Sequence, residues 1–363
     1  MFRLELFIIL FCCPFFICYS QISVKDSLSL ETVSFVEIYS ENGSLVGVSD
    51  KDGFISDELI KEIEKNNKKV TLVHSNYKNY IVDTRLIEKL SNIFLTPIYI
   101  KLNEVVITRP HKNKYLKLTG YFRSVQSNEK TPHYFIDGLV SYFINLESGK
   151  VKMTILSNRS LENKNIKQLS NRYYFLLAGV PSLNEYLKYS NLSKEYSMNI
   201  EKQGDIKIKN KEGDTTVAGS IIGSKEISNL QLEVISNQNP KIMKFLGMES
   251  HLNRYIISSI YSTPEINDVG FDNLLYFKEI RDYDIRKKRK DNFTKIEAVH
   301  EFFVIDKEYI NNLDAEKFDD FYTFKLTSSY KNIFWNKVDN KLFQPIPRSL
   351  ELFIEQNLTE SKK

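Results

Sequence analysis

The five histidines of the chain are the first residues to test for chemistry. A zinc peptidase holds its ion with an H-x-x-E pair and a distant histidine, or with H-E-x-x-H on one helix. Neither spacing occurs here. The residues three positions after the histidines are Tyr77, Lys114, Ile136, Arg254 and Phe303. His300 and Glu301 are neighbours in a predicted strand and therefore point to opposite faces. The sequence predicts no metal site and argues against a zinc peptidase.

Motifs for serine hydrolysis and phosphate binding do not occur in the sequence either. A serine nucleophile commonly stands in G-x-S-x-G, but in GSIIG (219–223) Ser220 lies beside the first glycine and the stretch has the composition of a strand. Neither G-x-x-x-x-G-K-[ST] nor G-x-G-x-x-G is present. The sequence therefore predicts no catalytic residue and no cofactor. A hydrolase site assembled from scattered serine, histidine and acidic residues stays open as an alternative.

The stretch HYFID (133–137) places His133 and Asp137 four residues apart. This spacing suits one face of a helix, but the alternating pattern around it indicates a strand. In a strand the two side chains share a face and lie too far apart for a direct bond. We expect both to be ordinary surface residues.

Two acidic groups are candidates for calcium. The first is Glu265, Asp268 and Asp272, and the second is Asp282 and Asp284. Both lack the D-x-[DN]-x-[DN]-G order and the distant glutamate of a calcium-binding loop. Turns and solvated strand edges are therefore the favoured interpretation.

A run of five consecutive bases is the sharpest local feature of the sequence. In DIRKKRKDN (284–292) these bases are Arg286, Lys287, Lys288, Arg289 and Lys290, and they lie between two predicted strands. Clustered cations near an anionic surface contribute about 1 kcal/mol each, so the run could contact an acidic partner, lipid headgroups or lipopolysaccharide phosphates. The alternative is a solvated hairpin tip whose charges prevent edge pairing, and this structural interpretation is favoured.

The apolar segment LFIILFCCPFFICYSQ near the start of the chain contains all three cysteines, Cys12, Cys13 and Cys18. A secretory signal needs a short positive start, an apolar run of about 7–15 residues and small residues at the cut. The matching features here are Arg3, the run 6–17 and Ser20. The run is shorter than the roughly 20 residues of a membrane-spanning helix. We therefore expect residues 1–20 to be a signal peptide that is removed.

Removal of this segment would leave a chain without cysteine. Such a chain can hold neither a disulfide, nor a thiolate metal site, nor a cysteine nucleophile. A lipid-attached cysteine is the rival interpretation. It is disfavoured because Phe11, Cys12 and Ile17, rather than small residues, precede the three thiols.

The charge balance and length of the chain restrict its class. Removal of residues 1–20 takes away one base, Arg3, and one acid, Glu5, so the net charge stays at +4. This mild excess is spread along the chain and gives no case for nucleic-acid binding. A length of 363 residues suggests two domains. The 24 phenylalanines and 21 tyrosines favour aromatic-rich sheets.

Residues 21–108 have the pattern of short alternating strands separated by turns. The segment 34–40 alternates, and Asn42-Gly43 and Asp52-Gly53 are turn sequences. A helix is predicted over 57–69, with Ser56 or Asp57 as its cap. Strands are expected again over 69–82 and 98–108. The sequence thus predicts a small β module.

These residues resemble the carboxypeptidase regulatory-like domain, a transthyretin-like β-sandwich. The family's "T-D-x-x-G-x-F" hairpin corresponds here to Ser49, Asp50, Gly53 and Phe54, and its closing "L-x-E-V-V-V" strand corresponds to Leu102, Glu104, Val105, Val106 and Ile107. The resemblance implies a β-sandwich at the N-terminus of an exported envelope protein of a Gram-negative bacterium, as in many TonB-linked outer-membrane receptors. It also implies a structural or adaptor role without catalytic residues.

A linker over 109–114 is predicted to separate this module from a larger α+β domain, 115–363, because Pro110 stops the strand before it. The larger domain opens on an "L-x-G-Y-F-R" sequence that resembles the start of domains following the module in other envelope proteins. The matching residues are Leu118, Gly120, Tyr121, Phe122 and Arg123.

Strands dominate the prediction for the larger domain. The segment 134–158 is expected to form two strands joined at Glu147-Ser148-Gly149, and five further strand segments follow between 203 and 305. In the last of them Ile296, Ala298, His300, Phe302 and Val304 should share one face. Helices are predicted over 165–179, over 180–192 with Pro181-Ser182 at its start, and over 347–358. Short connections imply an antiparallel meander.

The fold predicted from the sequence is therefore mainly β, with a transthyretin-like sandwich followed by a curved antiparallel sheet that carries helices on its concave side, as in lipoprotein carriers. The predicted protein is a non-catalytic binding or scaffold protein, periplasmic or associated with the outer membrane. The expected partners are an envelope protein or lipid, and not nucleic acid. Two alternatives stay open. A deep polar pocket with converging titratable groups would favour a hydrolase, and an apolar groove would favour a lipid or peptide carrier.

Overall fold

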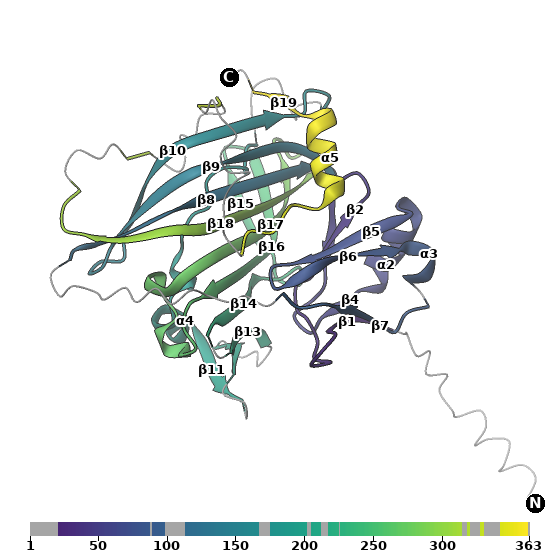
Figure 1. Cartoon of the computed structure of the whole chain (residues 1–363). Helices are drawn as coiled ribbons and strands as arrows, with labels where there is room; N and C mark the ends of the chain where they lie inside the picture. The colour runs from purple at the N-terminus through teal and green to yellow at the C-terminus, as the bar shows by residue number, and fades with distance from the viewer. Residues whose placement is uncertain are drawn as a thin grey trace, which may run out of the picture.

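The computed structural model of the chain describes residues 21–87, 89–98, 113–166, 175–201, 205–211, 217–224, 226–313, 318–319, 327–329 and 342–361 (Figure 1). The predicted signal peptide lies outside these residues, as do all but the first residue of the predicted strand 98–108 and most of the predicted linker 109–114. The described chain contains two small sheets, formed by residues before 98, and one 12-stranded sheet.

The N-terminal module comprises residues 21–97. Its strands are β1 (Ile22–Asp26), β2 (Glu37–Ser40), β3 (Leu45–Val48), β4 (Phe54–Ile55), β5 (Lys69–His74), β6 (Tyr77–Asp83) and β7 (Asn92–Leu95), and its helices are α2 (Asp57–Asn66) and α3 (Thr84–Ile87). One sheet has the order β4-β1-β7 and the other β3-β2-β5-β6. Side chains of both sheets and of α2, among them Val24, Ile38 and Ile63, form one buried cluster.

Local sequence explains most of the module. Gly43 and Gly53 have φ of 79° and 80°, which the two predicted turns require. Helix α2 begins after Ser56, whose hydroxyl accepts a hydrogen bond from the Leu59 amide at 3.3 Å, so the predicted helix start and cap are confirmed. The helix ends at Asn66 rather than at residue 69, because Lys69 already belongs to β5. Strand β7 was not predicted. It pairs in parallel with β1, and such a distant pairing leaves no local pattern.

The large sheet contains β8 (Tyr115–Asn128), β9 (Thr131–Asn145), β10 (Val151–Glu162), β11 (Tyr196–Ile200), β12 (Ile206–Asn210), β13 (Val217–Gly223), β14 (Ser228–Ile235), β15 (Lys241–Phe245), β16 (Met248–Tyr261), β17 (Leu274–Arg286), β18 (Thr294–Ile310) and β19 (Thr359–Glu360). The order is β11-β12-β13-β14-β16-β17-β18-β8-β9-β10-β19, and β15 pairs with β16. All of these pairs are antiparallel. The predicted meander is confirmed within 115–162 and within 196–310, and the β18–β8 pair joins the two runs.

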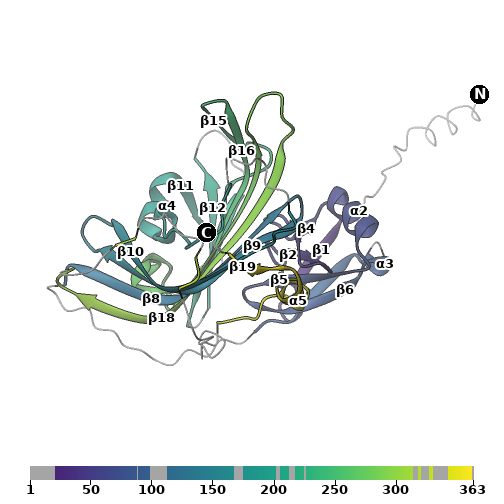
Figure 2. The same ribbon diagram turned by 90° about the horizontal axis from the view of Figure 1, so that it is seen from above.

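The two faces of the sheet carry different side chains. In β18, Ile296, Phe302 and Val304 belong to the main core cluster on one face, whereas Val299 and Phe303 belong to clusters on the other, as the alternation predicted. We call these the inner and the outer face. Figure 2 shows that the sheet is strongly curved and bends around helix α4 (Tyr189–Glu195) on the inner side.

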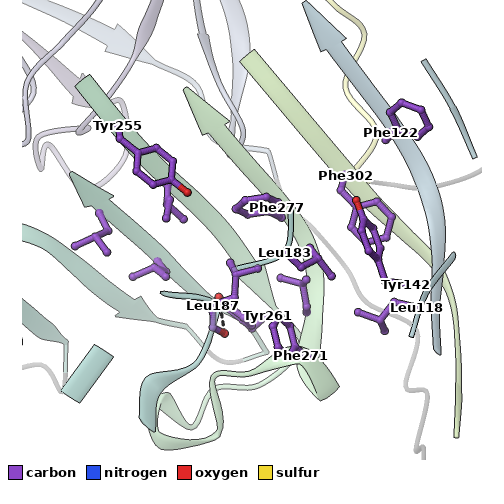
Figure 3. Packing of buried hydrophobic residues seen from close by; sticks show 14 of the residues in the cluster. Leu118, Phe122, Tyr142, Leu183, Leu187, Tyr255, Tyr261, Phe271, Phe277 and Phe302 are labelled. Carbon is purple, nitrogen blue, oxygen red and sulfur yellow. Dashed lines mark hydrogen bonds between the residues drawn. The ribbon is translucent and has the colours of Figure 1, made fainter. Parts of the chain in front are cut away.

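The inner face is a packed core. The segment 175–195 covers it and inserts Leu183, Leu187 and Leu192. Figure 3 shows Leu187 close to Tyr261 and Phe271, below the row of aromatic rings contributed by the strands. A Cβ atom at Gly120 or Gly138 would lie 2.2 or 2.1 Å from a backbone oxygen of the neighbouring strand, so the sheet requires glycine at both positions.

Of the helix predicted over 165–179, residues 167–174 lie outside the described part of the chain and residues 175–179 are not helical, whereas the helix predicted over 180–192 is confirmed only in its second half. Within the described part of these ranges, residues 175–184 are not helical, and a short 3-10 turn (Glu185–Leu187) precedes α4. The sheet supplies the physical reason. The Gln126 side-chain oxygen accepts hydrogen bonds from the amides of Leu177 and Ala178 at 2.7 and 3.1 Å, which replace helical partners.

Helix α5 (Arg348–Asn357) begins directly after Pro347, as predicted. It lies on the outer face and not on the concave side, so the predicted placement of helices holds for α4 only. One cluster joins the three parts of this contact: Tyr39, Leu45 and Val48 from the module, Val125, Ile280 and Val299 from the sheet, and Leu350, Ile354 and Leu358 from the C-terminal segment. The outer face is therefore the junction between module and sheet.

Candidate functional sites

A group of charged side chains is buried at the junction of module and sheet, and we call it the junction cluster. It consists of Glu37, Arg123, Lys278 and Glu301, whose side chains are 3, 6, 6 and 11% exposed. Lys278 pairs with Glu37 of β2, and Arg123 of β8 pairs with Glu301 of β18. Lys278 Nζ also lies 3.9 Å from Glu301 Oε1. The cluster thus links two sheets by alternating charges.

Neutral groups complete the hydrogen bonding of the cluster. Tyr39 donates to Glu37 at 2.9 Å, and Tyr276 donates to Glu301 at 2.7 Å. Arg123 donates to the Gln344 carbonyl at 2.7 Å, and its guanidinium lies over the rings of Phe303 and Phe343. Buried charges are tolerated when each one has a charged partner and further hydrogen bonds. Glu37, Arg123 and Glu301 meet that condition, and Lys278 is held by its two carboxylate partners.

The two carboxyl groups of the junction cluster differ in pKa. Burial raises the pKa of Glu37, against the opposing effect of Lys278. Burial also acts to raise the pKa of Glu301, but the charges of Arg123 and Lys278 prevail and lower it to about 2. A cavity of about 20 Å³ lies beside the cluster, which is room for about one water molecule. The arrangement can fix one domain on another, but it offers no room for a substrate.

A second polar group lies on the inner face, across three neighbouring strands. Ser124 of β8 is the cross-strand partner of His300 in β18, and His300 is the partner of Glu279 in β17. Ser124 Oγ lies 2.9 Å from His300 Nδ1. A serine, a histidine and an acid in line are the residue types of a hydrolase triad. Sequence analysis missed this set, because it depends on the pairing of β8 with β18.

The surroundings of this set are those of a core. Ser124, His300 and Glu279 are 0, 4 and 2% exposed. The Gly179 amide donates to Ser124 Oγ at 3.1 Å, and the Glu279 carboxylate accepts from Arg281 at 2.8 Å and from Tyr255 at 3.1 Å. Burial lowers the pKa of His300, although Glu279 acts in the opposite direction. The hydroxyl and the carboxylate are therefore engaged elsewhere, and no residue of this set lines either of the two hollows described here.

A larger hollow of about 370 Å³ opens beside the turn 267–273. Its lining includes Lys188, Asp268 and Asp272. Lys188 Nζ lies 4.7 Å from the centre of the Phe271 ring, and Tyr309 donates to Asp272 at 3.0 Å. The acids of this first acidic group lie on turns, as predicted. The hollow is open to solvent, and its charged side chains do not converge on one point.

The predicted basic run lies at the loop that joins β17 to β18, as its interpretation as a hairpin tip required. Arg286 ends β17, and its guanidinium pairs with Glu249 at 2.5 Å and lies 4.4 Å from the Phe293 ring centre. Lys288, Arg289 and Lys290 are exposed, and Lys287 is half-buried. The structure thus divides the run: Arg286 has a structural role, and the three exposed residues face solvent.

Three residues expected at the surface are buried instead. His133, Asp137 and Asp282 are 3, 1 and 6% exposed. His133 and Asp137 lie on the outer face of β9, where Asp137 pairs with Arg159 of the neighbouring strand β10 at 2.7 Å. Burial lowers the pKa of His133 to about 4. The prediction for Asp137 failed because its burial depends on Tyr121 and Arg159, which the neighbouring strands β8 and β10 place beside it.

Comparison of the chain with protein-family models and with curated proteins gives no match. Among the residues that the structure describes, no group of three or more histidine, cysteine, aspartate and glutamate side chains is arranged to hold a metal ion. Within the same residues, no helix is long and apolar enough to cross a membrane. The geometry therefore defines the protein by fold alone: a mainly β protein in which a module of two sheets packs on a large curved antiparallel sheet.

Proposed function

We propose that the chain is an exported, non-catalytic binding or scaffold protein of the Gram-negative cell envelope, periplasmic or associated with the outer membrane. In this proposal residues 21–108 are a carboxypeptidase regulatory-like, transthyretin-like β-sandwich. Residues 115–363 are an α+β domain that presents surfaces to an envelope protein or to lipid. The apolar leader and the sequence resemblance support the export and the domain type.

The junction cluster is the observation that carries the scaffold function. Domains that move independently usually meet at small polar interfaces. Here the contact between module and sheet is an apolar cluster with four buried, mutually paired charges at its side. An uncompensated buried charge is costly, so the cluster favours one relative position of the two parts. A rigid pair of β domains suits a protein that holds partners at fixed positions.

Cell fractionation tests the export. In a Gram-negative host, a C-terminally tagged chain should appear in the periplasmic or membrane fraction, and its N-terminal residue should be Gln21. Recovery of the full chain from the cytosol with Met1 intact would contradict the proposal.

Hydrogen exchange tests the rigidity. The amides of β2, in the module, should be protected to the same degree as those of β17, in the sheet, because the two strands open together. In Lys278→Met the amides of β2 and of residues 342–347 should exchange faster. Independent exchange of β2 and β17 in the unaltered chain would argue against a rigid scaffold.

A hydrolase is the second candidate, because Ser124 and His300 are in hydrogen-bond contact and Glu279 is next to His300. A fluorophosphonate probe labels an activated serine. We expect no labelling of the unaltered chain, since the Ser124 hydroxyl is buried and accepts the Gly179 amide. Labelling that is lost in Ser124→Ala but kept in Ser160→Ala, another fully buried serine of the sheet, would establish the hydrolase instead.

The carrier alternative lacks a supporting observation in the described residues. A carrier needs an open apolar groove, and the inner face of the sheet is filled by Leu183, Leu187 and Leu192.

A further inference from the structure

Two hairpins project from one end of the large sheet, and together they form what we call the tip, residues 241–251 and 284–293. Figure 2 shows the loop between β15 and β16 beside the loop between β17 and β18. The register agrees, because Glu249 pairs with Arg286 and a Cβ atom at Gly247 would lie 4.0 Å from the Lys287 carbonyl. The two loops are therefore one continuous surface.

Large apolar side chains are exposed at the tip. Leu246 is 90% exposed and Phe245 is 67% exposed, and Ile242 and Met243 are about half exposed at 53 and 47%. All five residues of β15 are exposed on both faces of the strand. Single exposed apolar residues need no explanation, but a contiguous set on one projection marks a contact surface.

Basic residues surround these apolar side chains. The tip contains seven bases, Lys241, Lys244, Arg286, Lys287, Lys288, Arg289 and Lys290, and three acids, Glu249, Asp284 and Asp291. Since the whole chain has a net charge of +4, the tip accounts for all of it. Glu249 is already paired with Arg286 at 2.5 Å, and its other oxygen lies 2.8 Å from His251 Nε2. The exposed surface of the tip is therefore apolar at its end and positive around it.

We propose that the tip docks on an anionic lipid bilayer. Phe245 and Leu246 enter the interfacial region, and Lys288, Arg289 and Lys290 lie against the headgroup phosphates. Apolar side chains next to a basic cluster are the combination that binds peripheral proteins to anionic membranes, because each contribution alone gives only weak binding. The inference rests on the proposed function for the identity of the membrane, but vesicle binding itself does not depend on export.

Charge selects lipid over a second copy of the chain. A symmetric dimer through the tip would bring two positive surfaces together, and like charges in an interface are unfavourable. The apolar residues also stand on a narrow projection rather than on a broad flat area. A stable protein interface usually buries about 800 Å² on each partner, whereas insertion into a bilayer needs only the end of a loop.

Fluorescence of a tryptophan placed in the tip gives the most direct test. Leu246→Trp should be quenched by brominated lipid in vesicles rich in phosphatidylglycerol, and not in vesicles of phosphatidylcholine alone. Leu86→Trp is the matched control, since Leu86 is also an exposed leucine, at 52%, but lies in α3 of the module. Trp335, the single tryptophan of the chain, is kept in both variants. Equal quenching at the two positions would overturn the inference.

Sedimentation of the full chain with the same vesicles separates the two contributions. Replacement of Lys288, Arg289 and Lys290 by glutamine should weaken binding about a hundredfold, because each base near an anionic surface contributes roughly a factor of five. The same charge change at Lys61, Lys65 and Lys69, exposed residues in and near α2, should leave binding unchanged. Leu246→Asp should weaken binding more than about tenfold, and Ile200→Asp, at an exposed residue of the edge strand β11, should not.

Several results would overturn the inference. One is equal sedimentation of the two triple variants, and another is binding that ignores the lipid charge. Self-association that Leu246→Asp abolishes, without binding to vesicles, would assign the tip to a second copy of the chain. Failure of vesicle binding would leave the envelope location and the rigid junction intact, whereas a cytosolic full-length chain that binds vesicles would refute the proposed function alone.

Discussion

The junction cluster and the tip contain the same kinds of side chain in opposite surroundings. At the junction, Lys278 and Arg123 are 6% exposed, and each has a carboxylate partner. At the tip, Lys288, Arg289 and Lys290 are exposed, next to apolar side chains that lack cover. Local composition did not distinguish the two regions. The two regions differ in exposure because the N-terminal module packs on the junction cluster, whereas the tip projects into solvent. The buried charges stabilise the fold, and the exposed charges are available to a partner.

The largest effect is expected from Lys278→Met. This change leaves Glu37 and Glu301 buried with one cation, Arg123, between them, and loss of one member of a buried ion pair costs about 3–5 kcal/mol. Urea unfolding measures the free energy of unfolding. Lys61→Met, at an exposed lysine of α2, is the control and should change it by less than about 0.5 kcal/mol. A loss of less than about 1 kcal/mol at Lys278 would remove the junction cluster as the support for a rigid scaffold.

The second prediction concerns pH and two carboxyl groups on the outer face of β18. Glu301 lies between two cations and has a pKa of about 2, below the ordinary value of 4.5, so its contribution to stability is lost as pH falls through this range. Burial and the neighbouring Asp282 raise the pKa of Glu297 from 4.5 to about 7, although Lys295 opposes the shift. The contribution of Glu297 is therefore present below pH 4.5 and lost as pH rises to about 7.

Glu297→Gln should remove this loss. Above pH 7 the variant should be more stable than the unaltered chain by about 1–3 kcal/mol, and below pH 4.5 the two should be nearly equal. Glu301→Gln should behave in the opposite sense, with a destabilisation that is largest above pH 4.5. Thermal melting at several pH values measures both. A Glu297→Gln variant that is destabilised across the whole range would mean that its pair with Lys295 dominates.

Local sequence patterns correctly predicted helix starts, turns and the two faces of a strand. Ser56 and Pro347 placed the starts of α2 and α5, Gly43 and Gly53 placed two turns, and alternation in β18 placed its faces. The basic run was correctly placed on a hairpin. In each case the residues that decide the structure are neighbours in the chain.

Distant pairings could not be predicted in this way. The contact of β8 with β18 joins segments separated by more than 160 residues in sequence, and it alone brings Ser124 to His300. The same pairing places Gln126 where it binds the amides of Leu177 and Ala178, so a segment with helical spacing is not helical there. Asp137 was predicted to be exposed because nothing near it in sequence indicates that Arg159 and Tyr121 will surround it.

A smaller effect on stability is expected from a change at Ser124 on the inner face. Its buried hydroxyl is uncharged and has hydrogen-bond partners in His300 and the Gly179 amide. Ser124→Ala removes the acceptor of the Gly179 amide and the partner of His300 Nδ1. The loss of stability should be about 1–2 kcal/mol, less than for Lys278→Met because no charge is left unpaired. Ser193→Ala, at an exposed position of α4, should cost less than about 0.5 kcal/mol. Denaturant unfolding of both variants gives the comparison, and equal costs would mean that the Ser124 contacts contribute nothing.

The smallest effect on stability is expected at the tip, although the change in charge is the largest. Replacement of Lys288, Arg289 and Lys290 by glutamine should alter the free energy of unfolding by less than about 0.5 kcal/mol, because these side chains are exposed and Arg286, which pairs with Glu249, is kept.

Salt should distinguish the exposed charges of the tip from the buried charges of the junction cluster. At 1 M salt, where the Debye length is about 3 Å, exposed charges are screened and buried pairs are not. At this salt concentration, vesicle binding by the tip should be lost, whereas the contribution of Lys278 to the free energy of unfolding should be unchanged. If instead the tip variant were destabilised and that loss resisted salt, these three bases would stabilise the fold, and the contrast between the two regions would fail.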